Sequence, residues 1–410
     1  MSFMAKITEN SHVAGRIFGG SKIGRLLKGH AGIRKKIISE IAIERSRKTV
    51  WIHAASLGEF AIARPLIELL KSTCNIVITF FSPSGYEAIK ETGKYKNVFY
   101  LPWDSKSNAS WFVGTIRPDA ALFMVSEYWH NYLDALHSAG IPLFLVSAII
   151  RKDSAFFKWY GGMYRKALLA YDEILTLDDS SSICVKAIGC HKVSVMGDPL
   201  FDNAYRVAGT PYRNDVVSRF KNGDRVFVAG SIDTKRDLQM IAHLANEHPS
   251  QKFLIVPHCV SPSILRQIIG EIKQKTVLYS DCDTKTDFSG VQCLVIDFVG
   301  ALAYLYRYGE MVYVGGGFTP YLHSVVEPAV YGIPVAFGPN TKRKIMPQQM
   351  SELGIGRRIR NYNELREWYL ENVDNPFLLN KVKEMASDYI AKNIGASARI
   401  VETLKERIDG

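Results

Sequence analysis

Unbroken apolar runs, separated by polar segments that contain glycine, recur along the chain from residue 49 onward. Such runs are typical of strands buried on both faces of a parallel sheet. Apolar residues with helical spacing lie between many of them, which predicts strand–helix units with right-handed crossovers. The strands are predicted at 49–54, 75–81, 98–101, 120–125, 141–147, 174–176, 193–195, 226–229, 253–256, 277–279, 293–296, 312–314 and just before Gly338.

A polar stretch divides these strands into two groups. Residues 204–224 are rich in polar residues, glycine and proline, a composition typical of a linker. We therefore predict two Rossmann-like parallel-sheet domains over residues 49–203 and 225–410, preceded by a separate segment over residues 1–48. A length of 410 residues fits two such domains. Helices are predicted near the C-terminus at 362–373 and 376–407.

Positive charge is concentrated in the segment 1–48. The chain has a net charge of +11, and its first 50 residues hold eleven Lys and Arg against three Glu. Residues 33–47 have the spacing of an amphipathic helix, whereas glycines interrupt the preceding part. Basic residues beside an apolar stripe suit an anionic membrane surface. A helix packed on its own domain, with a solvated basic face, fits the pattern equally well.

Several classes of protein are excluded by composition. None of the six cysteines has C-x-x-C spacing and no Cys/His cluster has zinc-ligand spacing, so no metal or redox site is predicted. The N-terminus has no signal-peptide pattern, and no apolar run reaches the roughly 20 residues needed to span a bilayer. Aromatic and basic residues do not interleave on one element, which argues against nucleic-acid binding. A reduced cytoplasmic compartment fits best.

Glu59 is the candidate catalytic residue. It follows Ser56 and Gly58 after the first predicted strand, and ligands bind beyond the carboxyl ends of strands in open parallel sheets. A carboxylate in the first helical turn is stabilised by the helix dipole, whereas burial would raise its pKa. Glu127 has a similar position after the strand at 120–125. Either carboxylate could also be a helix cap without a catalytic role.

A glycine-rich stretch in the second half is a candidate anion site. Gly315, Gly316 and Gly317 follow the strand at 312–314, so their N–H groups could approach a phosphate, aided by the helix expected after them. Glu327 falls inside that helix, where its carboxylate could accept hydrogen bonds from a ribose diol. A structural turn without a ligand would show the same glycines.

Three more residues of the second half are candidates for nucleotide contacts. Ser231 lies at a strand-to-helix turn, where it could donate to a phosphate or simply cap the helix. His258 follows a strand and is either a ligand contact or an exposed histidine. His323 lies four residues before Glu327, on the same side of the helix if that helix begins early. If the edges of the two predicted sheets face each other, they enclose a central cleft.

Several motifs occur together and in order. They are Trp51-Ile52-His53-Ala54-Ala55-Ser56-Leu57-Gly58-Glu59, Val125-Ser126-Glu127-Tyr128-Trp129-His130-Asn131, Gly197-Asp198-x-x-Phe201-Asp202, Gly230-Ser231, Val256-Pro257-His258 and residues 312–340. Together they resemble the 3-deoxy-D-manno-octulosonic acid (Kdo) transferases of lipopolysaccharide synthesis, over roughly residues 49 to 400. The resemblance implies an α/β protein of the two-domain GT-B class of glycosyltransferases.

This resemblance implies that the chain transfers Kdo from CMP-Kdo to a lipid A precursor of the lipid IVA type, without a metal or other cofactor. Glu59 corresponds to the base that deprotonates the acceptor hydroxyl as CMP leaves. A peripheral protein at the cytoplasmic face of the inner membrane is also implied. Ser56, Gly58 and Glu127 match the acceptor side, and Ser231, His258, Gly315, Gly316, Gly317, His323, Ser324 and Glu327 match the nucleotide side.

The chain departs from the family pattern at four points. A basic segment replaces the hydrophobic N-terminal anchor of many members, Val125 replaces a Glu, Ser324 replaces an Asn, and no Arg precedes His258. Another GT-B enzyme, such as a UDP-sugar glycosyltransferase or epimerase, is the first alternative. The second is a non-catalytic nucleotide- or lipid-binding module, against which the presence of both Glu59 and Glu327 argues.

Overall fold

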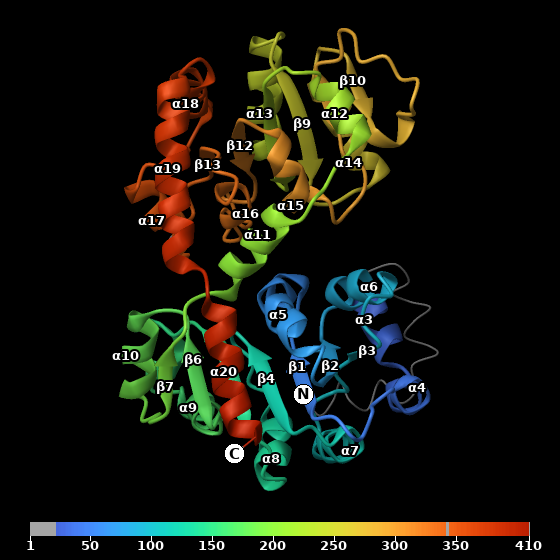
Figure 1. Ribbon diagram of the computed structural model, residues 1–410, viewed down its shortest axis with the longest axis vertical. Coiled ribbons are helices and arrows are strands. Elements are labelled where there is room, and N and C mark those ends of the chain that lie inside the picture. Colours follow the sequence, from blue (N-terminus) through green and yellow to red (C-terminus); the bar gives the residue numbers. More distant parts are fainter. Residues whose placement is uncertain (1–21, 342–343, 410) are drawn as a thin grey trace. The chain divides into compact units, whose positions relative to one another are not determined.

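The computed structural model describes residues 22–341 and 344–409, which form two α/β domains (Figure 1). The first domain comprises the chain up to Asn203 together with the segment that begins at Ile394, and the second comprises Ala204–Asn393. The linker predicted at 204–224 is replaced by helices, because apolar residues such as Val217 and Phe220 are buried there. The C-terminal segment, predicted to lie in the second domain, belongs to the first.

The first domain is a parallel sheet with helices between its strands. Its strands are β1 (Thr49–His53), β2 (Asn75–Phe80), β3 (Asn97–Tyr100), β4 (Ala120–Met124), β5 (Leu143–Ala148), β6 (Glu173–Thr176) and β7 (Val193–Val195). Its helices are α3 (Lys22–His30), α4 (Ile33–Glu40), α5 (Leu57–Leu70), α6 (Pro83–Glu91), α7 (Lys106–Ile116), α8 (His130–Ser138), η1 (Ala155–Phe157), α9 (Gly162–Leu169), α10 (Asp179–Ala187) and α20 (Ala396–Asp409).

The second domain has the same architecture. Its strands are β8 (Val226–Ile232), β9 (Lys252–Pro257), β10 (Thr276–Leu278), β11 (Cys293–Val295), β12 (Met311–Val314), β13 (Val335–Phe337) and β14 (Gly356–Arg358). Its helices are α11 (Pro199–Gly209, which begins in the first domain), α12 (Asp215–Lys221), α13 (Lys235–Glu247), α14 (Pro262–Glu271), η2 (Tyr279–Asp281), α15 (Leu302–Leu305), η3 (Tyr306–Tyr308), α16 (Val326–Ala329), α17 (Ile345–Glu352), α18 (Tyr362–Val373) and α19 (Pro376–Asn393).

Strand order places one switch point in each sheet. The orders are β3-β2-β1-β4-β5-β6-β7 in the first sheet and β10-β11-β9-β8-β12-β13-β14 in the second, and all pairs are parallel. The winding direction therefore reverses between β1 and β4 and between β8 and β12. Open parallel sheets bind ligands at such points, beyond the carboxyl ends of the strands. The predicted parallel α/β architecture is confirmed, and its topology singles out two places for a site.

The described part of the basic N-terminal segment packs on its own domain. Ile37 of α4 is fully buried in the core of the first domain. Arg34 donates hydrogen bonds to side chains of α7, and Lys36 donates one to the Tyr86 hydroxyl. Residues 22–48 therefore follow the own-domain alternative, and the rest of the predicted segment lies outside the described residues. Within the described ranges, no helix has the length and apolar character to cross a membrane.

Candidate active site

Glu59 lies in the first turn of α5, at the switch point of the first sheet. Ser56 is the N-cap of this helix, and its hydroxyl oxygen accepts a hydrogen bond from the Glu59 N–H at 3.4 Å. The Glu59 Oε2 atom accepts one from the N–H of Ala55 at 2.5 Å. The helix-capping geometry anticipated for Glu59 is thus present, and it fixes where the carboxyl group lies.

The environment of Glu59 makes its carboxyl group a weaker acid than an ordinary Glu side chain. Burial raises its pKa to about 7, and the negative charge of Glu127 raises it as well. Hydrogen bonds from the backbone of Ala55 and Ser56 oppose this shift. A carboxyl group with a pKa near neutrality has the matched basicity that a general base needs at physiological pH. The local structure therefore suits Glu59 for accepting a proton.

A network of buried side chains ties Glu127 to the neighbouring strands. The Trp129 indole N–H donates to Glu127 Oε2 and, at 3.0 Å, to Nε2 of His53. Because an indole N–H can only donate, His53 Nε2 accepts and its proton sits on Nδ1, 2.9 Å from Thr79 Oγ1. His53 is fully buried, as its position inside an apolar strand predicts. The network fixes the Glu127 carboxylate beside the end of β1.

Backbone strain marks the carboxyl ends of three central strands. Val125 (φ 63°), Ser147 (φ 55°) and Ser231 (φ 52°) adopt left-handed conformations, which cost roughly 1–3 kcal/mol each for residues other than glycine. The pairing of β5 with β6 and of β8 with β9 shifts register at Ser147 and Ser231, respectively. Strain of this kind clusters where a site requires a particular geometry. Ser231 is not a helix cap, since Thr234 caps α13.

The glycine turn after β12 is packed inside the second domain. The Gly315 N–H donates to the carbonyl of Gly230 at 2.9 Å, and the Gly316 N–H donates to Asp237 Oδ2 at 3.1 Å. The prediction that these two N–H groups bind a phosphate is therefore wrong. Glycine is required for a different reason, because a Cβ atom at Gly317 would lie 2.6 Å from the backbone of the strand end after β13.

The helix expected directly after this turn is displaced and short. The next helix after the glycine turn is α16, which has four residues and begins at Val326. His323 therefore lies in the preceding loop, and the helix is too short to add a positive end to an anion site. Glu327 is half-buried in its first turn, and burial raises the pKa of Glu327 to about 7. Among the residues that the structure describes, no group donates a hydrogen bond to its carboxylate.

Two polar atoms beside Glu327 are buried without a partner. His323 Nε2 and Ser324 Oγ have no hydrogen bond in the structure. An unsatisfied buried polar group costs about 1–3 kcal/mol, so such atoms mark the place of a water or a ligand. Both belong to residues that the sequence assigned to the nucleotide side. Each of these two buried atoms could still take part in a hydrogen bond with a ligand.

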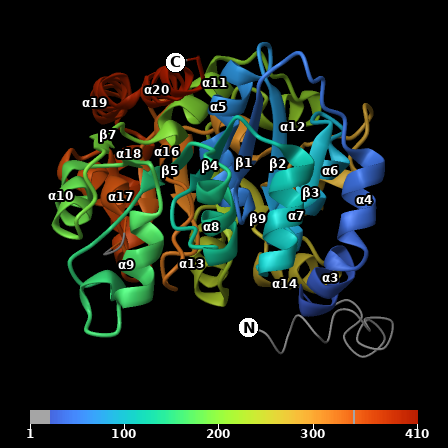
Figure 2. The ribbon, with the colours of Figure 1, turned by 90° about the horizontal axis from the view of Figure 1, so that it is seen from below.

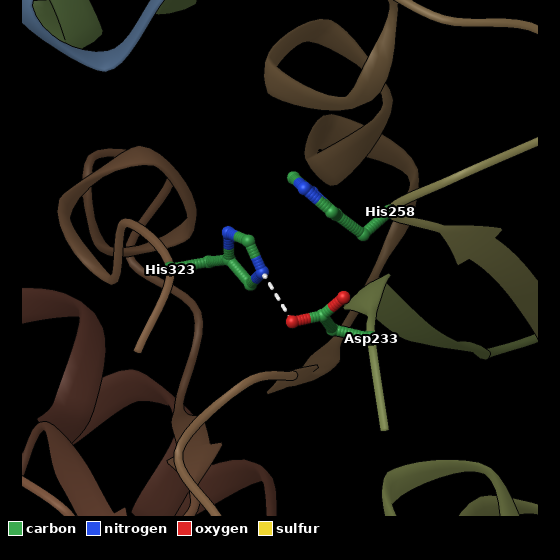
Figure 3. Close-up of side chains that lie close together, drawn as sticks. All are labelled: Asp233, His258 and His323. Carbon is green, nitrogen blue, oxygen red and sulfur yellow. Dashed lines mark ion pairs between the residues drawn. The ribbon is translucent and has the colours of Figure 1, made fainter. Parts of the chain in front are cut away.

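Asp233, His258 and His323 come together from the loops after β8, β9 and β12 (Figure 3). His323 Nε2 lies 3.8 Å from Asp233 Oδ2, and the two imidazole rings are 4.3 Å apart. Burial and the neighbouring His258 lower the pKa of His323 to about 4, so its ring is neutral at neutral pH. The sequence identified the two histidines but not Asp233, because only strand order brings these loops together.

The same cluster is a candidate cation site that the sequence did not predict. One ligand atom from each of the three residues lies within 4.8 Å of the others. Two imidazoles and a carboxylate suit a first-row divalent metal ion such as Zn²⁺. The imidazole N–H groups would equally suit the oxygens of a phosphate. Chemistry alone therefore leaves two ligands for this cluster, and an experiment must separate them.

Sequence comparisons find Kdo transferases. A family model described as 3-deoxy-D-manno-octulosonic-acid transferase (kdotransferase) matches residues 30–203. A 3-deoxy-D-manno-octulosonic acid transferase of Aquifex aeolicus is 24% identical over 341 residues, which cover 81% of this chain and 88% of that protein. One of Bordetella pertussis is 25% identical over 377 residues, with 87% of each chain covered. These relatives span both domains.

Structural comparison confirms the fold class. The crystal structure of a UDP-GlcNAc 2-epimerase from Neisseria meningitidis bound to UDP-GlcNAc matches with a TM-score of 0.62. The alignment covers 88% of this chain and all of that chain at 16% identity. At this identity the likeness concerns the fold, which is the two-domain GT-B fold.

Proposed function

We propose that this chain is a member of the Kdo transferase family and that it transfers Kdo from CMP-Kdo to a lipid A precursor of the lipid IVA type. The observation that carries the proposal is the Glu59 carboxyl group, which lies at the switch point of the first sheet with its pKa raised to about 7. The proposed place of action is the cytoplasmic face of the inner membrane, where such an acceptor would be presented.

The first domain supplies the base and the acceptor contacts. An acceptor hydroxyl gives its proton to the Glu59 carboxylate while its oxygen forms a bond to the anomeric carbon of Kdo. The bond from that carbon to the phosphate oxygen breaks, and the electron pair leaves with CMP. General-base assistance of this kind contributes roughly 10²- to 10⁴-fold to a rate. Glu127, held by the indole of Trp129, is assigned to the acceptor together with Ser56 and Gly58.

The second domain supplies the nucleotide contacts. The unpartnered polar atoms of His323 and Ser324, with Ser231 and His258, bind the phosphate and neighbouring donor oxygens. These groups take the place of the Gly315 and Gly316 N–H groups, and they provide preorganised electrostatic stabilisation of the departing phosphate. The Glu327 carboxylate accepts hydrogen bonds from the ribose diol, since no protein group within the described ranges occupies it.

We propose that the reaction needs no metal ion. The cluster of Asp233, His258 and His323 then acts on the phosphate through its imidazole N–H groups. A divalent cation held by the same three residues is the competing assignment. Chelation of metal ions before the assay separates the two, because only the second assignment loses activity.

The rival function is that of a different GT-B enzyme. The likeness to UDP-GlcNAc 2-epimerases favours it only through the fold. A donor panel of CMP-Kdo and UDP-N-acetylglucosamine distinguishes the two, with tetra-acylated lipid A precursor as acceptor and product mass as readout. We expect a product mass increased by one or more Kdo residues with CMP-Kdo alone. Turnover of UDP-N-acetylglucosamine without Kdo transfer would establish the rival instead.

The same assay tests the role of Glu59. Glu59→Gln keeps the size of the side chain but cannot accept a proton, so transfer should be lost while CMP still binds. Glu68→Gln is the matched control, because Glu68 lies on the same helix and pairs with Lys71 and Lys94 at the surface. Full activity of Glu59→Gln would contradict the proposal, and loss of activity in both variants would show a general effect of altering α5.

A further inference from the structure

Exposed apolar side chains are concentrated in one short segment of the first domain. Trp159 is 94% exposed, Met163 61%, Tyr160 56% and Phe157 40%. Other exposed large apolar residues of the described chain are more scattered, and scattered ones are a normal feature of protein surfaces. A contiguous group of this kind marks an interaction site. We call Phe157, Trp159, Tyr160 and Met163, with the lysines described next, the aromatic–basic surface.

Positive charge surrounds these apolar side chains. Lys152, Lys158 and Lys166 are exposed, and within the described ranges none of the three has an ion pair. Asp153 is the one acidic residue between positions 151 and 169. Several basic residues at the N-terminus, by contrast, are bonded to their own domain, as Arg34 is to α7. The aromatic–basic surface therefore carries unneutralised positive charge beside apolar side chains.

The exposed side chains are held outward by a rigid base. Arg165 donates hydrogen bonds to the carbonyl groups of Phe156 at 2.7 Å and Lys158 at 3.2 Å. The loop is tight enough that a Cβ atom at Gly161 would lie 2.2 Å from the carbonyl oxygen of Ala155. Figure 2 shows the loop before α9 extending at the edge of the first domain. The chain thus holds an aromatic cluster in water without an internal partner for it.

The base of this loop is joined to the acceptor-side residues. Phe156 is buried and makes an edge-on contact with Tyr128, with ring centroids 5.4 Å apart, and Tyr164 packs on the same ring at 6.4 Å. Tyr128 directly follows Glu127, and the Tyr171 hydroxyl donates to the Glu127 carbonyl. The aromatic–basic surface is therefore fixed in position relative to the carboxylate assigned to the acceptor.

We propose that the aromatic–basic surface docks the first domain on an anionic lipid bilayer. Tryptophan and tyrosine favour the interfacial layer of a membrane, and lysines beside them are attracted to anionic headgroups. The inference rests on the proposed function for one point only, namely that a membrane-embedded acceptor is brought to Glu127. It differs from attachment through the basic N-terminal segment, since several described charges of that segment are used within the domain.

Vesicle binding of the full-length protein tests the proposal. The probes are vesicles of phosphatidylcholine with and without phosphatidylglycerol, and the readout is the bound fraction after sedimentation. The variants are Phe157→Ser/Trp159→Ser, which removes aromatic area, and Lys158→Glu/Lys166→Glu, which reverses charge. Each should lower the affinity for anionic vesicles about tenfold or more. The matched control is Phe377→Ser on α19, because Phe377 is 79% exposed in the other domain; it should bind as the wild type does.

Two results would overturn the proposal. One is equal vesicle binding by the wild type and both double variants. The other is a dimer of the wild type, without vesicles, that the aromatic variant dissociates, since a second copy of the chain would then be the occupant. Unfolding temperatures of all variants confirm that these surface changes leave the fold intact.

The transfer assay tests the proposed function separately from the vesicle-binding assay. Transfer to an acceptor in detergent should be unchanged in the aromatic variant, whereas transfer to acceptor embedded in anionic vesicles should fall with vesicle binding. If the wild type transferred Kdo to no acceptor but still bound vesicles, the proposed function would fail and the docking surface would stand. If it transferred Kdo in detergent and ignored vesicles, the reverse would hold.

Discussion

Glu59 in the first domain and Glu327 in the second are alike in two respects and opposite in a third. Each lies in the first turn of a helix near a switch point of its sheet, and burial raises the pKa of each to about 7. Glu59 accepts a hydrogen bond from the Ala55 N–H and lies near the charge of Glu127. Glu327 has no hydrogen bond from any described residue.

Under the proposed function, this difference separates a reacting group, Glu59, from a binding group, Glu327. A carboxyl group whose position is fixed by the backbone, and whose basicity is raised by a second carboxylate, is suited to take up a proton. A carboxylate that is half-buried and lacks donors gains most from a ligand that brings them. Two carboxyl groups with similar pKa values can therefore have different roles. The hydrogen-bond donors and charges around each carboxyl group distinguish these roles.

Glu59→Gln should have the largest effect. We expect the turnover number for Kdo transfer to fall by about 10²- to 10⁴-fold, because the amide cannot accept a proton. The dissociation constant for CMP, measured by calorimetry, should stay within about twofold, because the proposal gives Glu59 no contact with the nucleotide. A large loss of CMP affinity would instead place Glu59 on the nucleotide side and break the comparison.

Glu327→Gln should act in the opposite manner. Loss of charge-assisted hydrogen bonds to the ribose diol should weaken CMP binding by roughly 10- to 100-fold. Turnover at saturating donor should change much less, since the group does not take part in proton transfer. The measurements are KM and the turnover number from steady-state kinetics, together with the dissociation constant from a direct titration with CMP. Equal losses in turnover for Glu59→Gln and Glu327→Gln would abolish the distinction.

The pH dependence of transfer follows from the raised pKa of Glu59. The base acts when ionised, so kcat/KM should rise with pH up to about 7 and fall roughly tenfold per unit below it. Glu127→Gln removes a negative charge that raises this pKa, so the rising limb should move to lower pH. A limb that stays in place in this variant would show that the two carboxylates are not coupled.

Stability should respond to Glu327 with a definite sign. Its pKa in the folded state lies near 7, above the ordinary value of 4.5, so its stabilising contribution is complete below 4.5 and is lost as pH rises through 7. At about pH 8, Glu327→Gln should therefore be more stable than the wild type by about 1–2 kcal/mol of unfolding free energy and should unfold at a higher temperature. In acid, the two proteins should be equally stable. Exposed Glu384→Gln on α19 is the control and should match the wild type.

The smallest expected effect is that of chelation. If the cluster of Asp233, His258 and His323 contacts phosphate directly, dialysis against EDTA should leave the transfer rate unchanged within error. Loss of activity that Zn²⁺ or another divalent ion restores would assign the cluster to a metal. The role of the second domain would then extend from binding to charge neutralisation by the ion.

The strands could be predicted because burial on both faces leaves a continuous apolar run. β14 was missed for the same reason, since Arg357 and Arg358 are exposed. The residues at 204–224 looked like a linker because only a few apolar positions, such as Val217 and Phe220, reveal their helices. Nothing in local composition indicates that α20 packs on the first domain, where Ile400 and Leu404 enter the core.

Candidate site residues that belong to a sequence motif could be proposed from the sequence. Residues that strand order brings together could not. Glu59 stands out beside Gly58 and Glu327 beside Pro328, but a glycine triplet does not reveal that Asp237 already accepts the hydrogen bond of the Gly316 N–H. Asp233 meets His323 only because β8 and β12 are neighbours in the sheet. Sequence spacing predicts contacts between residues that are close in the chain, whereas contacts between loops depend on strand order.

The return of α20 makes the second domain an insertion within the first. The Asp202 carboxylate accepts hydrogen bonds from the N–H groups of Gly395 at 2.5 Å and Ser397 at 2.7 Å, so the outgoing and returning chain are fastened together. During synthesis on the ribosome, the domain that is begun first is therefore completed last. A stop codon that removes only the final helix would spare the second domain and leave the nascent first domain without part of its core.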